Sequence, residues 1–106
     1  MRLGLLVLVI LMVCSSTGFA SSRSQRVHGA SVFAASGCSH CHSIRNAGGH
    51  KGPDLAGVGR RLKKDQMRRQ ITEGSKRMPP FGDTLQEKEL ADLISYLRSC
   101  RDKTKK

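Results

Sequence analysis

The stretch Cys38-Ser39-His40-Cys41-His42 places two thiols three residues apart, with an imidazole directly after the second thiol. This C-x-x-C-H spacing is the attachment signature of a c-type haem. On one helical turn, Cys38 and Cys41 can reach the two vinyl groups on one edge of a porphyrin and form thioethers. His42 is then held beneath the ring, where its neutral imidazole can bind iron. We therefore predict one covalent haem c, with His42 as a ligand of the iron.

Two other interpretations of this stretch are open. A redox-active CxxC pair would require a βαβ context, which the flanking sequence does not offer. A zinc site could combine the motif with His28 or His50, in a small nucleic-acid-binding module. No second CxxC or HxxxH pair completes such a set at an established spacing. The sequence thus favours haem and predicts no nucleic-acid partner.

The N-terminal segment predicts export. Arg2 precedes an uncharged apolar run, residues 3–14, and small residues, Gly18 and Ala20, stand at positions −3 and −1 of the expected cleavage site. This order is typical of a secretory signal peptide, so we predict residues 1–20 to be a signal peptide cleaved after Ala20. The expected compartment is the bacterial periplasm.

Two alternatives to cleavage exist. An uncleaved leader would act as a membrane anchor, although the apolar run is short for a hydrocarbon core of roughly 30 Å. A lipoprotein attachment at Cys14 is disfavoured because bulky Val13 stands where a small residue is needed.

Composition points to a small domain that depends on a cofactor. Only 38% of the 106 residues are apolar, and the chain has no Trp, one Tyr and three Phe. Small domains with so little core usually need a disulfide, metal or cofactor for stability. We therefore expect the haem-free protein to be largely unfolded by circular dichroism. The net charge of +11 predicts acidic partner proteins, with peripheral membrane contact.

The cysteines left after signal cleavage are Cys38, Cys41 and Cys100, an odd number that argues against a disulfide framework. A bare CxxC would tend to oxidise in an exported protein, and thioether bonds to haem prevent this. Cys100 has no assigned role: it is either buried at a helix end or an exposed thiol able to dimerise. We expect a monomer.

Three helices are predicted and no significant sheet. The first covers 25–36, with Ser24 as N-cap and Gly37 as its stop. It contains Gly29, which either marks the close approach of another helix or is simply tolerated there. The second covers 64–73 and ends at Gly74, with an apolar face made by Leu62, Met67 and Ile71.

The third helix begins with a capping box in which Thr84 is the N-cap and Glu87 is N3, and it ends near Ser99. Its apolar stripe has the helical period and comprises Leu90, Leu93, Ile94, Tyr96 and Leu97. The segments 46–59 and 75–82 are predicted to be loops, since they are rich in glycine or stiffened by proline.

A second axial ligand is predicted in the loop Met78-Pro79-Pro80-Phe81. Prolines restrict the backbone around Met78, which lowers the entropic cost of holding its thioether against iron. A methionine ligand favours ferrous iron and raises the reduction potential. The other candidates are Met67, expected in the core, and three histidines: His28, His40 and His50. His40 is too close to His42 to reach the opposite face.

These motifs together resemble the class I monohaem cytochromes c. They occur in the family's order: Gly29 and Phe33, Gly37 to His42, Gly52-Pro53-Asp54-Leu55, Met78 to Phe81, and the helix ending Tyr96-Leu97. The resemblance implies an all-α fold in which the first and last helices cross around the haem. It also implies a crossing at Gly29, packing of Phe33 on the last helix, and thioethers at Cys38 and Cys41.

By the same resemblance, His42 and Met78 are the axial ligands and the Pro53 carbonyl accepts from His42, while Leu55 packs on the ring. The cytochrome c domain would span 21–106, with a core at 27–99 and a charged tail at 101–106. The crevice tryptophan common in the family is missing, and Arg60 or Arg61 could instead hold the propionates.

The predicted function is one-electron transfer rather than enzymatic catalysis, because protein ligands fill both faces of the iron. Acidic redox partners would be steered by positive residues near the haem loops, namely Arg45, Lys51, Lys76 and Arg77. One alternative is a haem-bearing subunit of a dehydrogenase or oxidase complex. A second is a haem sensor or peroxidase in which Met78 is labile.

Overall fold

The computed structural model describes residues 21–103, and the predicted signal peptide lies outside this range. The described chain is mostly helical, which confirms the all-α prediction. No helix within it is long and apolar enough to cross a membrane. In chain order the elements are α2 (Ser22–Ala35), the 3₁₀ helix η2 (Cys38–His40), β1 (Ser43–Ile44), β2 (Ala47–Gly48), α3 (Val58–Arg61), α4 (Lys64–Glu73) and α5 (Glu87–Ser99).

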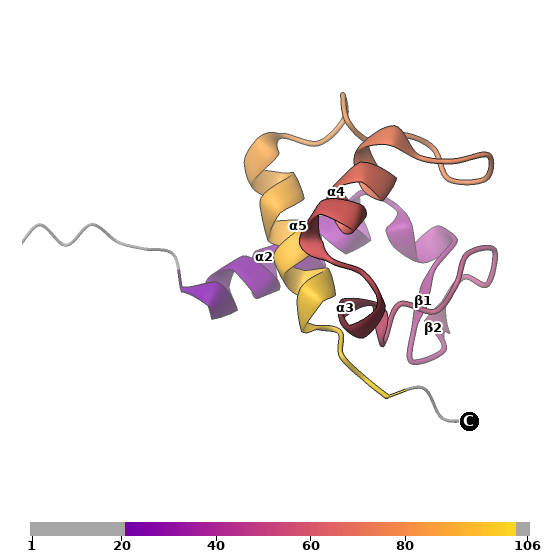
Figure 1. Ribbon diagram of the computed structural model, residues 1–106, viewed down its shortest axis with the longest axis horizontal. Coiled ribbons are helices and arrows are strands. Elements are labelled where there is room, and N and C mark those ends of the chain that lie inside the picture. The colour runs from indigo at the N-terminus through magenta and orange to yellow at the C-terminus, as the bar shows by residue number, and fades with distance from the viewer. Residues whose placement is uncertain (1–20, 104–106) are drawn as a thin grey trace, which may run out of the picture.

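The crossing of α2 and α5 is the largest contact between elements in the described chain, and α2 passes behind α5 in Figure 1. Gly29 sits at the crossing against the Asp92 carbonyl, and a Cβ there would lie 2.7 Å from Tyr96 Cβ. Only a residue without a side chain permits this approach. The close helix contact predicted at Gly29 is therefore present.

One hydrophobic core joins the crossing to α4. The Phe33 ring meets the Tyr96 ring edge-on, with centroids 5.9 Å apart, a preferred arrangement of aromatic pairs. The predicted apolar faces of α4 and α5 supply most of the remaining buried side chains: Met67, Ile71, Leu90, Leu93, Ile94 and Leu97.

The helix α4 has the predicted bounds. The N-caps predicted for the first and last helices, Ser24 and Thr84, are wrong. Ser21, not Ser24, caps α2, because its hydroxyl accepts the Ser24 backbone N–H at 3.2 Å. The helix α5 begins after Gln86, whose N–H is accepted by the Glu89 side chain at 2.9 Å. Thr84 lies two residues before the observed cap, in a turn where its N–H donates to the Phe81 carbonyl.

The segment between η2 and α4 has more structure than predicted. β1 and β2 form an antiparallel hairpin with Ser43 opposite Gly48. Its two turn residues, Arg45 and Asn46, both have positive φ, as the tight hairpin turn that suits twisted strands requires. The short helix α3 follows and packs on α5.

The first residues of the predicted charged tail are bonded to this segment. The Asp102 N–H donates to the Ala56 carbonyl at 2.9 Å, and the Gly59 N–H donates to the Cys100 carbonyl at 2.8 Å. The Arg45 guanidinium makes two bonds to the Asp102 carboxylate, at 2.5 and 2.9 Å. The chain after α5 therefore fastens α3 and the hairpin to the helix pair.

Candidate functional site

A cavity of about 790 Å³ lies between α4, α5, the cysteine motif and the two loops. Its volume falls within the roughly 300–1,000 Å³ typical of small-molecule sites. The walls are mainly apolar, and include Phe33, Leu55, Leu62, Phe81, Leu93 and Leu97. All six predicted site residues line it: Cys38, Cys41, His42, Pro53, Leu55 and Met78.

The cysteine motif is a single tight turn. Gly37 turns the chain into it with φ 78°, and the N–H groups of Cys41 and His42 both donate to the Cys38 carbonyl, at 3.2 and 2.9 Å. Both thiols therefore face the cavity from one turn, next to the imidazole. Burial raises the pKa of the Cys38 thiol above its usual value, which keeps this sulfur neutral at pH 7.

The His42 ring is oriented by two neighbours. Its Nδ1 lies 2.8 Å from the Pro53 carbonyl oxygen; because a carbonyl only accepts, Nδ1 must carry the proton. This tautomer leaves the Nε2 lone pair free to bind a metal ion. Gly52 packs against the same ring, where a Cβ would stand 2.6 Å from Cε1.

Asp54 organises the loop that carries Pro53, a role that the sequence analysis missed. Its carboxylate accepts from the Ser43 hydroxyl and from the backbone N–H groups of Asn46 and Ala56, at 2.8, 3.0 and 2.8 Å. These donors lower the pKa of Asp54 to about 2. The available signal was the Pro-Asp pair itself, since aspartate in a turn often bonds the N–H two residues on.

The loop with Met78 is bonded to the C-terminal end of α4. Gly74 ends the helix with φ 67°, and the Ser75 N–H donates to the Met78 carbonyl at 2.9 Å. The Phe81 N–H then donates to the Ile71 carbonyl at 2.9 Å. These bonds hold Met78 on the cavity wall formed by α4. The cysteine motif, residues 38–42, forms another part of the wall.

The other candidate ligands lie elsewhere or serve the core. Met67 is buried as predicted and forms part of the cavity wall. His40 and His50 are exposed and do not line the cavity, and His28 bonds to Asp92. Residues 21–103 contain no group of three His, Cys, Asp or Glu side chains arranged for a metal ion.

The positive residues divide into two groups. Lys51 and Arg77 line the cavity and are exposed. Arg60 and Arg61, either of which could hold the propionates, do not line it; each donates to a backbone carbonyl, of Arg101 and Asp54 respectively. Arg45 is paired with Asp102, which lowers the pKa of that carboxyl.

The cavity fits a haem c. Its apolar walls suit a porphyrin, two neighbouring thiols suit thioether attachment, and an imidazole and a thioether suit the two faces of iron. The absence of a Cβ at Gly52 makes room for the His42 ring.

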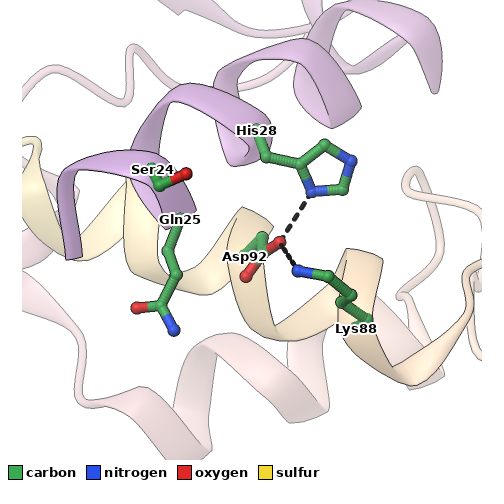
Figure 2. A pocket seen from close by; sticks show the side chains of 5 residues that line it. All are labelled: Ser24, Gln25, His28, Lys88 and Asp92. Atoms are coloured by element: carbon green, nitrogen blue, oxygen red, sulfur yellow. Dashed lines mark hydrogen bonds and ion pairs between the residues drawn. The ribbon is translucent and has the colours of Figure 1, made fainter. Parts of the chain in front are cut away.

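A smaller recess of about 240 Å³ lies at the other side of the helix crossing. Figure 2 shows Asp92 of α5 between His28 of α2 and Lys88. Asp92 Oδ2 lies 2.6 Å from His28 Nδ1 and 2.9 Å from Lys88 Nζ, and the Asp92 side chain is only 4% exposed. Both partners lower the pKa of Asp92, Lys88 most strongly. We assign this cluster a structural role at the crossing.

Comparison with known protein families gave one match. The family model described as cytochrome c oxidase, cbb3-type, subunit III, matches residues 25–97, which is more than half of the chain and includes every residue of the cavity. Searches of the curated proteins and of the solved structures found no match.

Proposed function

We propose that this chain, which belongs to the family described as cytochrome c oxidase, cbb3-type, subunit III, is a one-electron carrier. Membership of this family implies covalently bound haem c and electron transfer. Haem c, when bound, supplies a single-electron couple at its iron. The chain would shuttle electrons between exported or membrane-bound redox partners. Cavity walls that combine the Cys38 and Cys41 thiols, the His42 imidazole and the Met78 thioether are the observation that carries the proposal.

Each site residue has a proposed role. Cys38 and Cys41 form the thioethers, and His42 and Met78 are the two axial ligands. The bond from His42 Nδ1 to the Pro53 carbonyl supports the first assignment, because it fixes the tautomer and orientation of the ring. The bonding of the Met78 loop to α4 supports the second, since little entropy remains to be lost on coordination.

The proposed ligand pair favours electron transfer over catalysis. With an imidazole and a thioether on opposite faces, no coordination position is left for a substrate. The apolar walls exclude water, which disfavours the extra charge of the ferric state and raises the potential. Ligands held by the fold before reduction also keep the rearrangement between oxidation states small.

The partner side of the proposal rests on charge. Lys51 and Arg77 are exposed on the rim of the cavity, with Lys76 beside them. We expect this positive rim to attract an acidic patch on a reductase, dehydrogenase or oxidase, in a small transient contact. The proposed setting is the bacterial periplasm, with the chain as an exported monomer that touches the membrane surface peripherally.

A second candidate is a fixed haem-bearing subunit of an oxidase or dehydrogenase complex. The description of the matching family, which names an oxidase subunit, favours it. Purification from the native membrane separates the two candidates: a free carrier elutes alone at moderate salt, whereas a subunit copurifies with a larger haem enzyme.

Mass and absorption spectra of the protein from a host with haem-attachment machinery test the site. We expect the mass of one haem added to the polypeptide, and the weak near-infrared band of methionine-ligated ferric haem. Met78→Leu should abolish this band and allow rapid carbon monoxide binding, whereas the control Met67→Leu should retain the band. A polypeptide without added haem would contradict the proposal, and rapid carbon monoxide binding by the unmodified protein would favour a sensor or peroxidase.

A further inference from the structure

Gln70 lies in the last turn of α4 and faces the same cavity as Met78. Its side-chain amide nitrogen is 3.5 Å from the Met78 sulfur, within reach of a hydrogen bond to this large acceptor. We propose that Gln70 is a positioning residue that donates a hydrogen bond to the Met78 thioether and thereby raises the reduction potential. The inference rests on the proposed function, in which Met78 binds the iron.

The backbone brings these two side chains together. The Gly74 N–H donates to the Gln70 carbonyl at 3.0 Å, and the chain reverses immediately afterwards. Gly74 has φ 67°, and a Cβ there would lie 2.8 Å from the Pro80 nitrogen. The Ser75-to-Met78 bond completes the turn. The fixed helix end and the fixed loop therefore place the backbones of Gln70 and Met78 where their side chains can meet.

The chemistry of the two groups is complementary. A thioether sulfur has two lone pairs, so it can bind iron with one and accept the Gln70 N–H with the other. An accepted hydrogen bond withdraws electron density from sulfur and makes it a poorer donor to iron. Ferric iron needs this donation more than ferrous iron does, so the bond favours the reduced state. The Gln70 amide does not titrate near neutral pH, so its hydrogen bond would contribute no proton transfer to the one-electron step that a bound haem supplies.

The test measures the midpoint potential of the haem-loaded full chain after Gln70→Leu. Loss of one modest hydrogen bond, only part of whose strength differs between oxidation states, predicts an equilibrium constant for reduction about threefold lower. At 59 mV per tenfold change for one electron, the potential should fall by about 30 mV. The near-infrared band of methionine-ligated ferric haem should shift with it.

The sign of the shift separates this role from a merely structural one. An apolar side chain at position 70 excludes water better than glutamine does, which by itself would raise the potential. A fall therefore supports the hydrogen bond, and no change or a rise overturns it. Gln70→Ile, another apolar side chain that brings no iron ligand, must give the same fall and provides the measurement if Gln70→Leu does not fold.

Ser75→Ala is the matched control. Ser75 also lines the cavity, but it meets Met78 through its backbone N–H, which the substitution keeps. We expect less than half of the shift given by the Gln70 variants, and an equal shift would overturn the inference. If the unmodified protein shows no methionine band, the proposed function fails; if it shows the band but the Gln70 variants keep its potential, this inference alone fails.

Discussion

At the scale of single residues, Gly52 decides where the His42 ring can stand. A Cβ at position 52 would lie 2.6 Å from Cε1 and 2.8 Å from Nδ1 of the ring. Heavy atoms do not approach so closely, and the ring cannot move aside without giving up its 2.8 Å bond to the Pro53 carbonyl. Gly52 thus leaves room for the His42 ring, and the Pro53 carbonyl holds the ring in that position.

We therefore expect Gly52→Ala to disturb the haem site directly. Overpacking of this kind typically costs about 1–3 kcal/mol, and the ring must tilt or lose its carbonyl partner. Denaturant unfolding of the haem-loaded protein should show the loss of stability, and the ferric spectrum should show weakened axial coordination. The control Gly82→Ala, where the nearest atom to the new Cβ is at 3.1 Å, should cost less. Equal effects would contradict the role given to Gly52.

Asp54 makes the loop around His42 sensitive to acid. Its pKa of about 2 in the folded protein lies below its ordinary value of 3.8, so the folded state favours the charged carboxylate. The resulting stability is fully present above pH 4 and is lost as the pH falls towards 2. Asp54→Asn should lower the free energy of unfolding at pH 7 and flatten its decline between pH 4 and 2. Asp83→Asn, at an exposed loop position, should change neither, and a parallel decline in both variants would refute the assignment.

At the scale of elements, the crossing of α2 and α5 depends on contact between their backbones. Gly29 faces the Asp92 carbonyl and Tyr96 Cβ, and the Phe33–Tyr96 ring pair packs one turn further along. A side chain at position 29 would have to push the helices apart, which would loosen the core on both sides of the crossing.

Gly29→Ala should therefore destabilise the protein, although alanine ordinarily favours a helix by about 1 kcal/mol over glycine. We expect a net loss of about 1–3 kcal/mol in denaturant unfolding of the haem-loaded form. Ser31→Ala on the exposed side of the same helix should change stability by no more than about 0.5 kcal/mol. A stabilised Gly29→Ala protein would show that the helices are not in contact there.

The ion cluster on the outer side of the crossing should also respond to pH. Lys88 and His28 lower the pKa of the buried Asp92, so the stability that it contributes is present above its unfolded pKa of roughly 3.9 and is lost as the pH falls below it. The difference in unfolding free energy between the unmodified protein and Asp92→Asn should therefore shrink from pH 6 to pH 2. A constant difference would mean that packing, not charge, explains the position of Asp92.

The elements that the sequence predicted well are those with strong local patterns. The bounds of α4 and the buried stripe of α5 follow from helical spacing and a glycine stop. The caps at Ser24 and Thr84 were mispredicted because each cap depends on the direction of the preceding chain, and Thr84 is already engaged in a turn. The hairpin has only two residues per strand, too few for any alternation to show.

The residues of the candidate site also divide into those that a local sequence pattern predicts and those that it does not. A local motif identified Cys38, Cys41 and His42, and two prolines pointed to Met78. Asp54 and Gln70 escaped notice because their importance lies in partners from other parts of the loop or the cavity. For Arg60 and Arg61, which could hold the propionates, nearness in sequence to the haem loops gave no information on the carbonyls that they bond.

At the scale of the whole molecule, excess positive charge surrounds a cavity whose own walls are apolar. The chain carries 19 Lys and Arg residues against 8 Asp and Glu. Several of the acids are already engaged, since Asp54, Asp92 and Asp102 accept bonds within the fold. The field outside the molecule is therefore positive, and Lys51 and Arg77 concentrate it at the cavity rim.

Electron transfer should consequently depend on where the charges lie as well as on their sum. We expect the second-order rate of reduction by a small acidic flavodoxin to fall as salt rises, since the screening length is about 10 Å at 0.1 M ionic strength. The double change Lys51→Glu and Arg77→Glu should lower the rate at low salt about tenfold and weaken its salt dependence. The control, Arg23→Glu with Arg26→Glu on α2, removes the same total charge at positions that do not line the cavity. If both pairs slow the reaction equally, net charge alone attracts the partner; if only the rim pair does, the partner docks at the cavity rim.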